Sequence, residues 1–196
     1  MQDATPLISK GNLNSAPCLN LNIPQPRGHS VQFYEEDGSL LRELSQFIGA
    51  ALGGGGSAIV IATQTHREAL ASQLEQQGIH LQLATKNGRF LSLDAAEALS
   101  GFMVDGMPDA DLFNTMLGSV VAQMSGAANA RGHRLAAFGE MVALLWAEGN
   151  RDAAIYLEKL WNQLGERYAF HLHCAYPRKL VSDGNDYHIA DICSRH

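Results

Sequence analysis

The sequence has 196 residues, of which 46% are hydrophobic and 17% are charged, and this composition is sufficient for one folded domain with a substantial core. Its net charge of -6 argues against nucleic acid as the main partner, because phosphate binding requires clustered Lys and Arg. No apolar run approaches the roughly 20 residues needed to cross a bilayer, and we see no signal peptide. Three widely spaced cysteines form neither a disulfide framework nor a CxxC metal site. We therefore expect a reduced, cytoplasmic protein without a membrane segment.

The first 28 residues are rich in Asn, Pro, Ser and Gly, with single Leu and Ile residues between them. Such a segment buries too little apolar surface to order itself, so we predict a flexible tail at residues 1–28. A single folded domain is then expected at residues 29–196.

Beyond this tail, β-like apolar runs alternate with amphipathic segments. Strands are predicted at residues 30–34, 58–62, 90–93, 135–138 and 170–175. Helices are predicted at residues 40–51, 65–77, 95–104, 110–130, 141–148 and 152–168. This order predicts an α/β fold, a three-layer sandwich with about five mostly parallel strands and helices on both faces.

Three of the predicted helices carry a cap signal at their N-terminus. Thr65 with Glu68, and Asp94 with Glu97, have the spacing of a capping box. Asp109 precedes the longest amphipathic segment, so we expect its carboxylate to cap that helix.

The carboxyl ends of parallel strands share one edge of a sheet, where ligands bind in open α/β folds. The residues that follow the predicted strands are acids, histidine, threonine and aromatics. They include Phe33, Tyr34, Asp37, Thr63, His66, Glu140, Met141 and Tyr176. Glu140 is the most informative of them, because it separates a buried strand from an apolar helix. We predict a pocket walled by Phe33, Tyr34, Met141 and Trp146, with polar contacts from His29, Asp37, His66 and Glu140.

Two tryptophans and one acid on the segments after Glu140 extend this candidate site. Trp146 and Trp161 lie on apolar helix faces, where large aromatics usually belong to the core. Glu158 lies at the margin of the same apolar stripe as Trp161, where it could turn inward or remain in water. Aromatic walls with few polar groups suit a small apolar ligand, so Trp146, Glu158 and Trp161 are included as candidate ligand-binding residues.

The sequence contains no recognisable catalytic or cofactor motif. GxxxxGK[ST] and GxGxxG are absent, and the first strand is followed by Glu35, Glu36 and Asp37, whose carboxylates would repel a triphosphate. His171 and His173 share one strand face, but a sheet face packed on a helix explains them better than a metal site. No Ser or Cys has an evident base. We predict no catalytic residues, no metal and no cofactor.

Several short motifs occur in the order found in one known family. They are His29-x-x-x-Phe33-Tyr34-x-x-Asp37, Ile59-Val-Ile-Ala-Thr63 with His66-Arg67, Gly88-Arg89-Phe90, Leu93-Asp94-Ala95, Phe102-Met103-x-x-Gly106-x-Pro108-Asp109, Phe138-Gly-Glu-Met-Val142, Leu145-Trp146, Gly149-Asn150, Leu157-Glu158-x-Leu-Trp161-Asn162 and Cys174-Ala-Tyr-Pro177. Over residues 28–196 the chain resembles the MEDS domain, the methanogen/methylotroph DcmR-type sensory domain.

The resemblance implies a RecA/KaiC-like fold that has lost its phosphate-binding loop. It also implies sensing of small organic molecules, including one-carbon or halogenated hydrocarbon derivatives, in bacterial or archaeal two-component signalling or transcription regulation. Members usually precede a histidine kinase, a PAS module or a DNA-binding domain. We expect this chain to act in trans on such a partner, without binding DNA directly.

The main hypothesis is therefore a non-catalytic, ligand-binding sensory domain. Two alternatives stay open from the sequence: an enzyme or nucleotide-binding RecA-like protein with residual activity, and an oligomerisation or protein-interaction module that forms a homo-oligomer.

Overall fold

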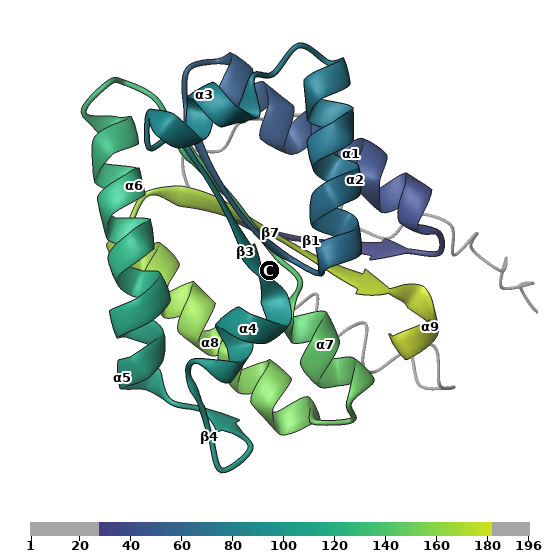
Figure 1. The fold of residues 1–196 in the computed structure, drawn as a ribbon. Coiled ribbons are helices and arrows are strands. Elements are labelled where there is room, and N and C mark those ends of the chain that lie inside the picture. Colours follow the sequence, from purple (N-terminus) through teal and green to yellow (C-terminus); the bar gives the residue numbers. More distant parts are fainter. Residues whose placement is uncertain (1–27, 182–196) are drawn as a thin grey trace, which may run out of the picture.

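The structure is a computed structural model that describes the backbone of residues 28–181 and the side chains of residues 28–179. The predicted flexible tail, Cys18 and Cys193 lie outside these described residues. Within them the chain forms a five-stranded sheet with helices on both faces, and Figure 1 shows the resulting three layers. The α/β sandwich predicted from the sequence is thus confirmed.

All neighbouring strands of this sheet run parallel, in the order β1-β7-β6-β2-β3. The strands are β1 (Gly28–Tyr34), β2 (Ser57–Ala62), β3 (Phe90–Asp94), β6 (Leu135–Gly139) and β7 (Phe170–Pro177). Every residue of β2 and β6 is buried, as expected for central strands covered on both faces, whereas all five residues of β3 at the edge are partly exposed.

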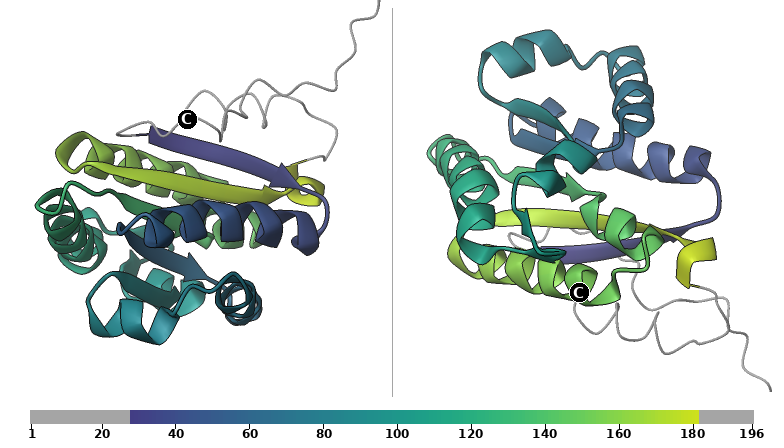
Figure 2. Two further views of the ribbon diagram at one scale, coloured as in Figure 1. Left: turned by 90° about the horizontal axis from the view of Figure 1, so that it is seen from above. Right: turned by 60° about the horizontal axis from the view of Figure 1, so that its bottom comes forward.

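Three helices cover one face of the sheet, and all the other helices except α9 cover the opposite face (Figures 1 and 2). The first face carries α1 (Asp37–Gly53), α2 (Gln64–Gln76) and α3 (Leu81–Lys86). The second carries α4 (Ala95–Ser100), α5 (Ala110–Phe113), η1 (Asn114–Gly118), α6 (Ser119–Asn129), α7 (Met141–Ala147) and α8 (Arg151–Arg167). A short hairpin, β4 (Met103–Val104) with β5 (Met107–Pro108), and α9 (Arg178–Val181) complete the described chain.

Most element boundaries match the sequence predictions, with a few differences. The segment predicted as one helix after Asp109 contains a π-helical turn, η1, between α5 and α6. The helix expected to reach Val104 ends at Ser100, and the hairpin follows it. Neither α3 nor this hairpin was predicted, because both are too short to carry a clear periodicity.

Two of the three predicted caps are confirmed and one is wrong. The side chains of Asp94 and Asp109 accept hydrogen bonds from backbone N–H groups at the starts of α4 and α5. Thr65 does not cap α2, since the helix already begins at Gln64 and its N-cap residue, Thr63, makes no side-chain cap bond. The group that replaces this local cap comes from a distant part of the chain, as described below.

The tetraglycine segment joins α1 to β2 through a close backbone approach. A Cβ atom on Gly56 would lie 2.5 Å from the carbonyl oxygen of Arg134 and 2.9 Å from that of Ala51. Gly55 has a φ of +85°, a backbone conformation that residues with a side chain rarely adopt. These glycines therefore serve the turn into β2.

Candidate functional site

The carboxyl ends of β2 and β6 lie next to each other in the middle of the sheet, yet the chain leaves them toward opposite faces. After β2 it enters α2 on the α1 side, and after β6 it enters α7 on the α8 side. The helices α2 and α7 are separated by the sheet in Figure 1. In open α/β sheets a ligand crevice forms at such a crossover point.

Glu140 lies at this crossover and binds across it. Its Oε2 accepts a hydrogen bond of 2.8 Å from the backbone N–H of Thr63, the N-cap residue of α2. Its Oε1 lies 2.7 Å from Nδ1 of His66, in the first turn of α2. The backbone N–H of Glu140 also donates to the carbonyl of Ile61 in β2. Glu140 is 4% exposed, so its carboxyl group lies buried at the N-terminus of α2, where the helix dipole favours negative charge.

His66 extends this network to the end of the first strand. Its Nε2 lies 3.6 Å from Oδ1 of Asp37, the first residue of α1, and the Asp37 side chain is 66% exposed. The ring of Tyr34 meets the ring of His66 edge to face at 6.4 Å. The carboxyl ends of β1, β2 and β6 are therefore joined by one cluster of polar residues. We call this cluster the edge network: Tyr34, Asp37, Thr63, His66 and Glu140.

The environment sets the protonation of two members of the edge network. The hydrogen bond with Glu140 raises the pKa of His66 above its ordinary value of 6.5, against the opposing effect of burial. Burial raises the pKa of the Tyr34 phenol, and the nearby Glu140 and Asp37 carboxylates raise it further. At neutral pH the network thus holds a neutral phenol and an imidazole biased toward its cationic form between two acids.

The single pocket predicted from the sequence is divided by the sheet. Tyr34 packs in the core cluster on the α1 side, whereas Phe33, Met141 and Trp146 belong to the cluster on the α8 side. Neighbouring strand residues point to opposite faces, so Phe33 and Tyr34 cannot wall the same pocket within the sheet. The four residues therefore do not pack in one cluster, and a pocket that all four line at the strand edge stays a prediction.

Three of the remaining predicted residues, Glu158, Trp161 and Tyr176, lie on the α8 side. Tyr176 contacts Phe33 with ring centroids 5.9 Å apart and Trp146 with centroids 6.3 Å apart. Its hydroxyl donates a 2.6 Å hydrogen bond to Glu158, which turns inward and is 3% exposed. Trp161 packs against Phe113 and Phe170 as a core residue.

His29 lies at the start of β1 and not at the carboxyl edge where the sequence placed it. Its Nδ1 lies 2.8 Å from Oδ1 of Asn162, and its Nε2 lies 3.2 Å from Sγ of Cys174 and 3.3 Å from Oε2 of Glu158. Asn162 and Cys174 were not predicted as site residues. The spacing in the sequence could have pointed to both residues. Asn162 follows Glu158 by one helical turn, and Cys174 shares a strand face with Tyr176.

His171 and His173 behave as predicted, on a sheet face packed against a helix. Both imidazoles lie within 3.1 Å of the hydroxyl of Ser30, and both rings contact Phe47 of α1. Burial lowers the pKa of His171, which favours its neutral form.

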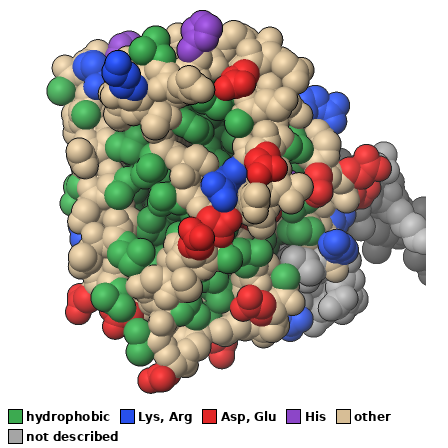
Figure 3. All heavy atoms as spheres, in the orientation of Figure 1, with side chains coloured by type: hydrophobic (Ala, Val, Ile, Leu, Met, Phe, Trp, Pro, Cys, Tyr) green, Lys and Arg blue, Asp and Glu red, His purple; other side chains and the backbone are tan. Residues whose placement is uncertain are grey.

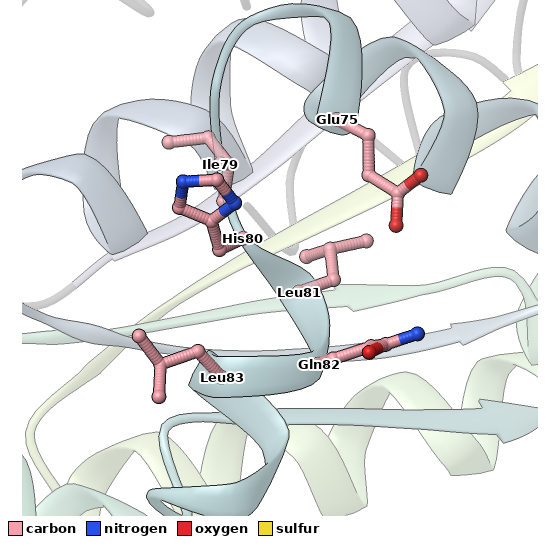
Figure 4. A pocket seen from close by; sticks show the side chains of 6 residues that line it. All are labelled: Glu75, Ile79, His80, Leu81, Gln82 and Leu83. Atoms are coloured by element: carbon pink, nitrogen blue, oxygen red, sulfur yellow. The ribbon is translucent and has the colours of Figure 1, made fainter.

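A separate surface hollow lies between the end of α2 and α3, lined by Glu75, Ile79, His80, Leu81, Gln82 and Leu83 (Figure 4). None of the predicted site residues lines it. None of the described helices has the length and apolarity needed to span a membrane.

Comparison with known proteins identifies the family. The family description that matches is MEDS, MEthanogen/methylotroph, DcmR Sensory domain, and the match covers residues 28–196. The chain belongs to the MEDS family. A search of the curated proteins finds no match. The family resemblance inferred from the sequence motifs is thereby confirmed.

Proposed function

We propose that this MEDS domain is a non-catalytic sensor whose small-molecule ligand binds at the edge network and whose signal reaches a partner protein in trans. The observation that carries the proposal is the position of Glu140. Its carboxylate occupies the N-terminus of α2 at the crossover between β2 and β6, where α/β sheets place their ligands.

The same observation argues against nucleotide turnover. A phosphate group at this helix N-terminus would have to displace a buried carboxylate that already accepts bonds from Thr63 and His66. It would also approach Asp37, which lies within 3.6 Å of His66. Two carboxylates near a polyanion repel it, so a RecA-like ancestry would persist here in the fold and not in ATP hydrolysis.

The edge network offers a way to convert binding into movement. Asp37 is exposed and gives solvent access, whereas Tyr34, His66 and Glu140 are buried behind it. A short organic molecule with one polar group would exchange hydrogen bonds with these side chains. Because Glu140 joins the start of α2 on one face to the start of α7 on the other, a change in its bonds would shift helices on both faces. Such a ligand must bind the two arrangements with different affinity.

A thermal-shift screen tests this assignment. One-carbon, short aliphatic and halogenated compounds are tested on the full chain, and a ligand at about 100 times its Kd is expected to stabilise the fold by about 2.7 kcal/mol. We expect Glu140→Gln and Tyr34→Ala to abolish the shift, and Glu75→Gln, an exposed change in α2, to preserve it. A hit that stabilises all variants equally would place the ligand elsewhere. ATP hydrolysis that disappears in Glu140→Ala would refute the non-catalytic assignment.

The interaction-module alternative also has a structural feature in its favour. Among the described residues β3 pairs with β2 alone and leaves its other edge open. Large hydrophobic residues are exposed at Leu83, Val104, Met107, Leu112 and Met116. Hydrophobic side chains are spread over the face of the molecule on which β3 runs (Figure 3). Light scattering over a range of concentrations, with and without a ligand, distinguishes the two functions: ligand-independent assembly supports the interaction module.

A further inference from the structure

A second polar cluster lies on the α8 side of the sheet, inside an apolar core and away from the edge network. It combines His29 of β1, Glu158 of α8 and Cys174 of β7. The side chains of His29 and Glu158 are 10% and 3% exposed, and Cys174 is fully buried. One ligand atom from each of the three lies within 4.8 Å of the other two. Buried polar groups of this kind require an explanation, because their desolvation is costly.

We propose that His29 Nε2, a carboxylate oxygen of Glu158 and Cys174 Sγ bind one divalent transition-metal ion of the zinc class. Nitrogen, oxygen and sulfur donors are the set that zinc takes from His, Glu and Cys. The charges also balance, since one thiolate and one carboxylate neutralise a divalent cation beside a neutral imidazole. The site does not depend on a ligand at the edge network.

The donor distances fit such an ion with a small adjustment. Nε2 of His29 is 3.2 Å from Sγ of Cys174 and 3.3 Å from Oε2 of Glu158. Zinc–ligand bonds of normal length in a tetrahedron separate nitrogen from oxygen by about 3.4 Å and nitrogen from sulfur by about 3.6 Å. These two donor pairs need to separate by only a few tenths of an ångström, and Sγ of Cys174 lies within 4.8 Å of a carboxylate oxygen of Glu158. Three protein donors leave the fourth position to water or another small donor.

Two further residues orient these donors as the outer partners of metal sites do. Asn162 Oδ1 lies 2.8 Å from Nδ1 of His29, so a proton on Nδ1 is held there and the lone pair of Nε2 faces Cys174. The hydroxyl of Tyr176 donates to Oε1 of Glu158 and leaves Oε2 directed toward His29. Partners of this kind fix the tautomer of a ligating histidine and the rotation of a ligating carboxylate.

A nucleophilic cysteine is the main rival explanation for this cluster. His29 lies between Cys174 and Asn162, as the histidine does in a Cys–His–Asn catalytic triad. Reactive cysteines are partly exposed and lie in electropositive surroundings. Cys174 is fully buried and its sulfur lies within 4.8 Å of a carboxylate oxygen of Glu158, so its surroundings are neither exposed nor electropositive. A substrate could not reach the sulfur atom, whereas a metal ion needs only the small space between the three donors.

Cobalt and zinc titrations of the chelator-stripped full chain test the proposal. Stoichiometric Co²⁺ binding is expected, with a near-ultraviolet thiolate-to-cobalt band that Zn²⁺ displaces. The band must persist when both other cysteines are replaced, Cys18→Ser with Cys193→Ser, and vanish in Cys174→Ser. Asn162→Ala is expected to keep the band but to weaken binding about 10- to 100-fold, as for other outer partners.

His29→Gln keeps the test decisive if Cys174→Ser does not fold, since His29 lies at the start of an edge strand. Circular dichroism confirms that it is folded, and it is expected to lose Co²⁺ binding, whereas His80→Gln at an exposed position is expected to retain it. The absence of a thiolate band in the wild-type chain would overturn the proposal. So would a band that survives Cys174→Ser, or wild-type Co²⁺ affinity in folded His29→Gln.

Discussion

Replacing Glu140 by Gln tests whether this carboxylate joins the helices on the two faces of the sheet. The amide preserves the size of the side chain and one acceptor oxygen. It cannot accept from both the Thr63 N–H and the His66 Nδ1–H, because its other terminal atom is a donor. One of the two bonds is therefore lost, and the buried NH2 group faces a donor.

The size of the effect follows from these contacts. A hydrogen bond to a charged group contributes about 1.5 to 3 kcal/mol, and an unsatisfied buried donor adds its own cost. We expect the free energy of unfolding to fall by about 3 kcal/mol. At about 2 to 4 °C per kcal/mol for a chain of this size, the melting temperature falls by about 6 to 12 °C.

The pH dependence gives the prediction a second, independent readout. Pairing with Glu140 raises the pKa of His66 above 6.5, so its contribution to stability is fully present below that value and is lost as the pH rises through the folded-state pKa. Urea unfolding followed by circular dichroism at about pH 6 and about pH 9 is expected to show a larger loss for Glu140→Gln at the lower pH.

Glu75→Gln is the matched control, because it removes an exposed carboxylate from α2, the helix whose start Glu140 contacts. It is expected to change the free energy of unfolding by less than about 0.5 kcal/mol. Equal stabilities of Glu140→Gln and Glu75→Gln would refute the reasoning. So would strict additivity of Glu140→Gln and His66→Gln, since residues in direct contact must show a coupling energy.

Four further substitutions test other parts of the fold. Trp161→Ala removes a ring with 1% exposure and is expected to cost about 3 to 5 kcal/mol in urea unfolding, and a smaller loss would mean that the core can collapse around the site. Asp94→Ala removes the cap observed at α4 and is expected to lower the free energy of unfolding by about 1 kcal/mol. Thr65→Ala in α2 is expected to leave it nearly unchanged. A larger loss for Thr65→Ala than for Asp94→Ala in thermal melts would contradict the cap assignment. Tyr176→Phe removes only the hydroxyl that donates to Glu158 and is expected to cost about 1.5 to 3 kcal/mol, measured by the same unfolding assay, and an unchanged stability would show that this bond adds nothing.

Much of the fold could be predicted because its signals are local. The apolar run at 58–62 and the periodic stripe of α8 each lie within one element, so strand and helix types were assigned from short segments. Asp94 and Asp109 were recognised as caps because a cap and its partners are two or three residues apart. Thr65 matched the same pattern and failed, because a distant carboxylate satisfies the start of α2 instead.

The candidate site was predicted only in part. Tyr34, Asp37, Thr63, His66 and Glu140 were expected at one edge because parallel strands align their carboxyl ends, and the structure brings them together there. Alternation along a strand predicts that the neighbours Phe33 and Tyr34 point to opposite faces of the sheet. The sequence interpretation grouped residues by the end of the strand and did not consider the face.

The order of strands and helices, the family, and the absence of a phosphate-binding motif after the first strand can all be read from the amino-acid sequence. Which side chains meet depends on the tertiary structure. Glu140 reaches Thr63 across 77 residues and His66 across 74, and His29 reaches Asn162 across 133 and Cys174 across 145. Contacts between residues so far apart in the sequence depend on the order of the strands in the sheet and on the face on which each connecting helix lies. Hydrophobic periodicity within one element gives no information about the strand order or about that face. For this reason the sequence pattern marks Glu140 as unusual, while its contacts with the start of α2 follow from the assembled sheet.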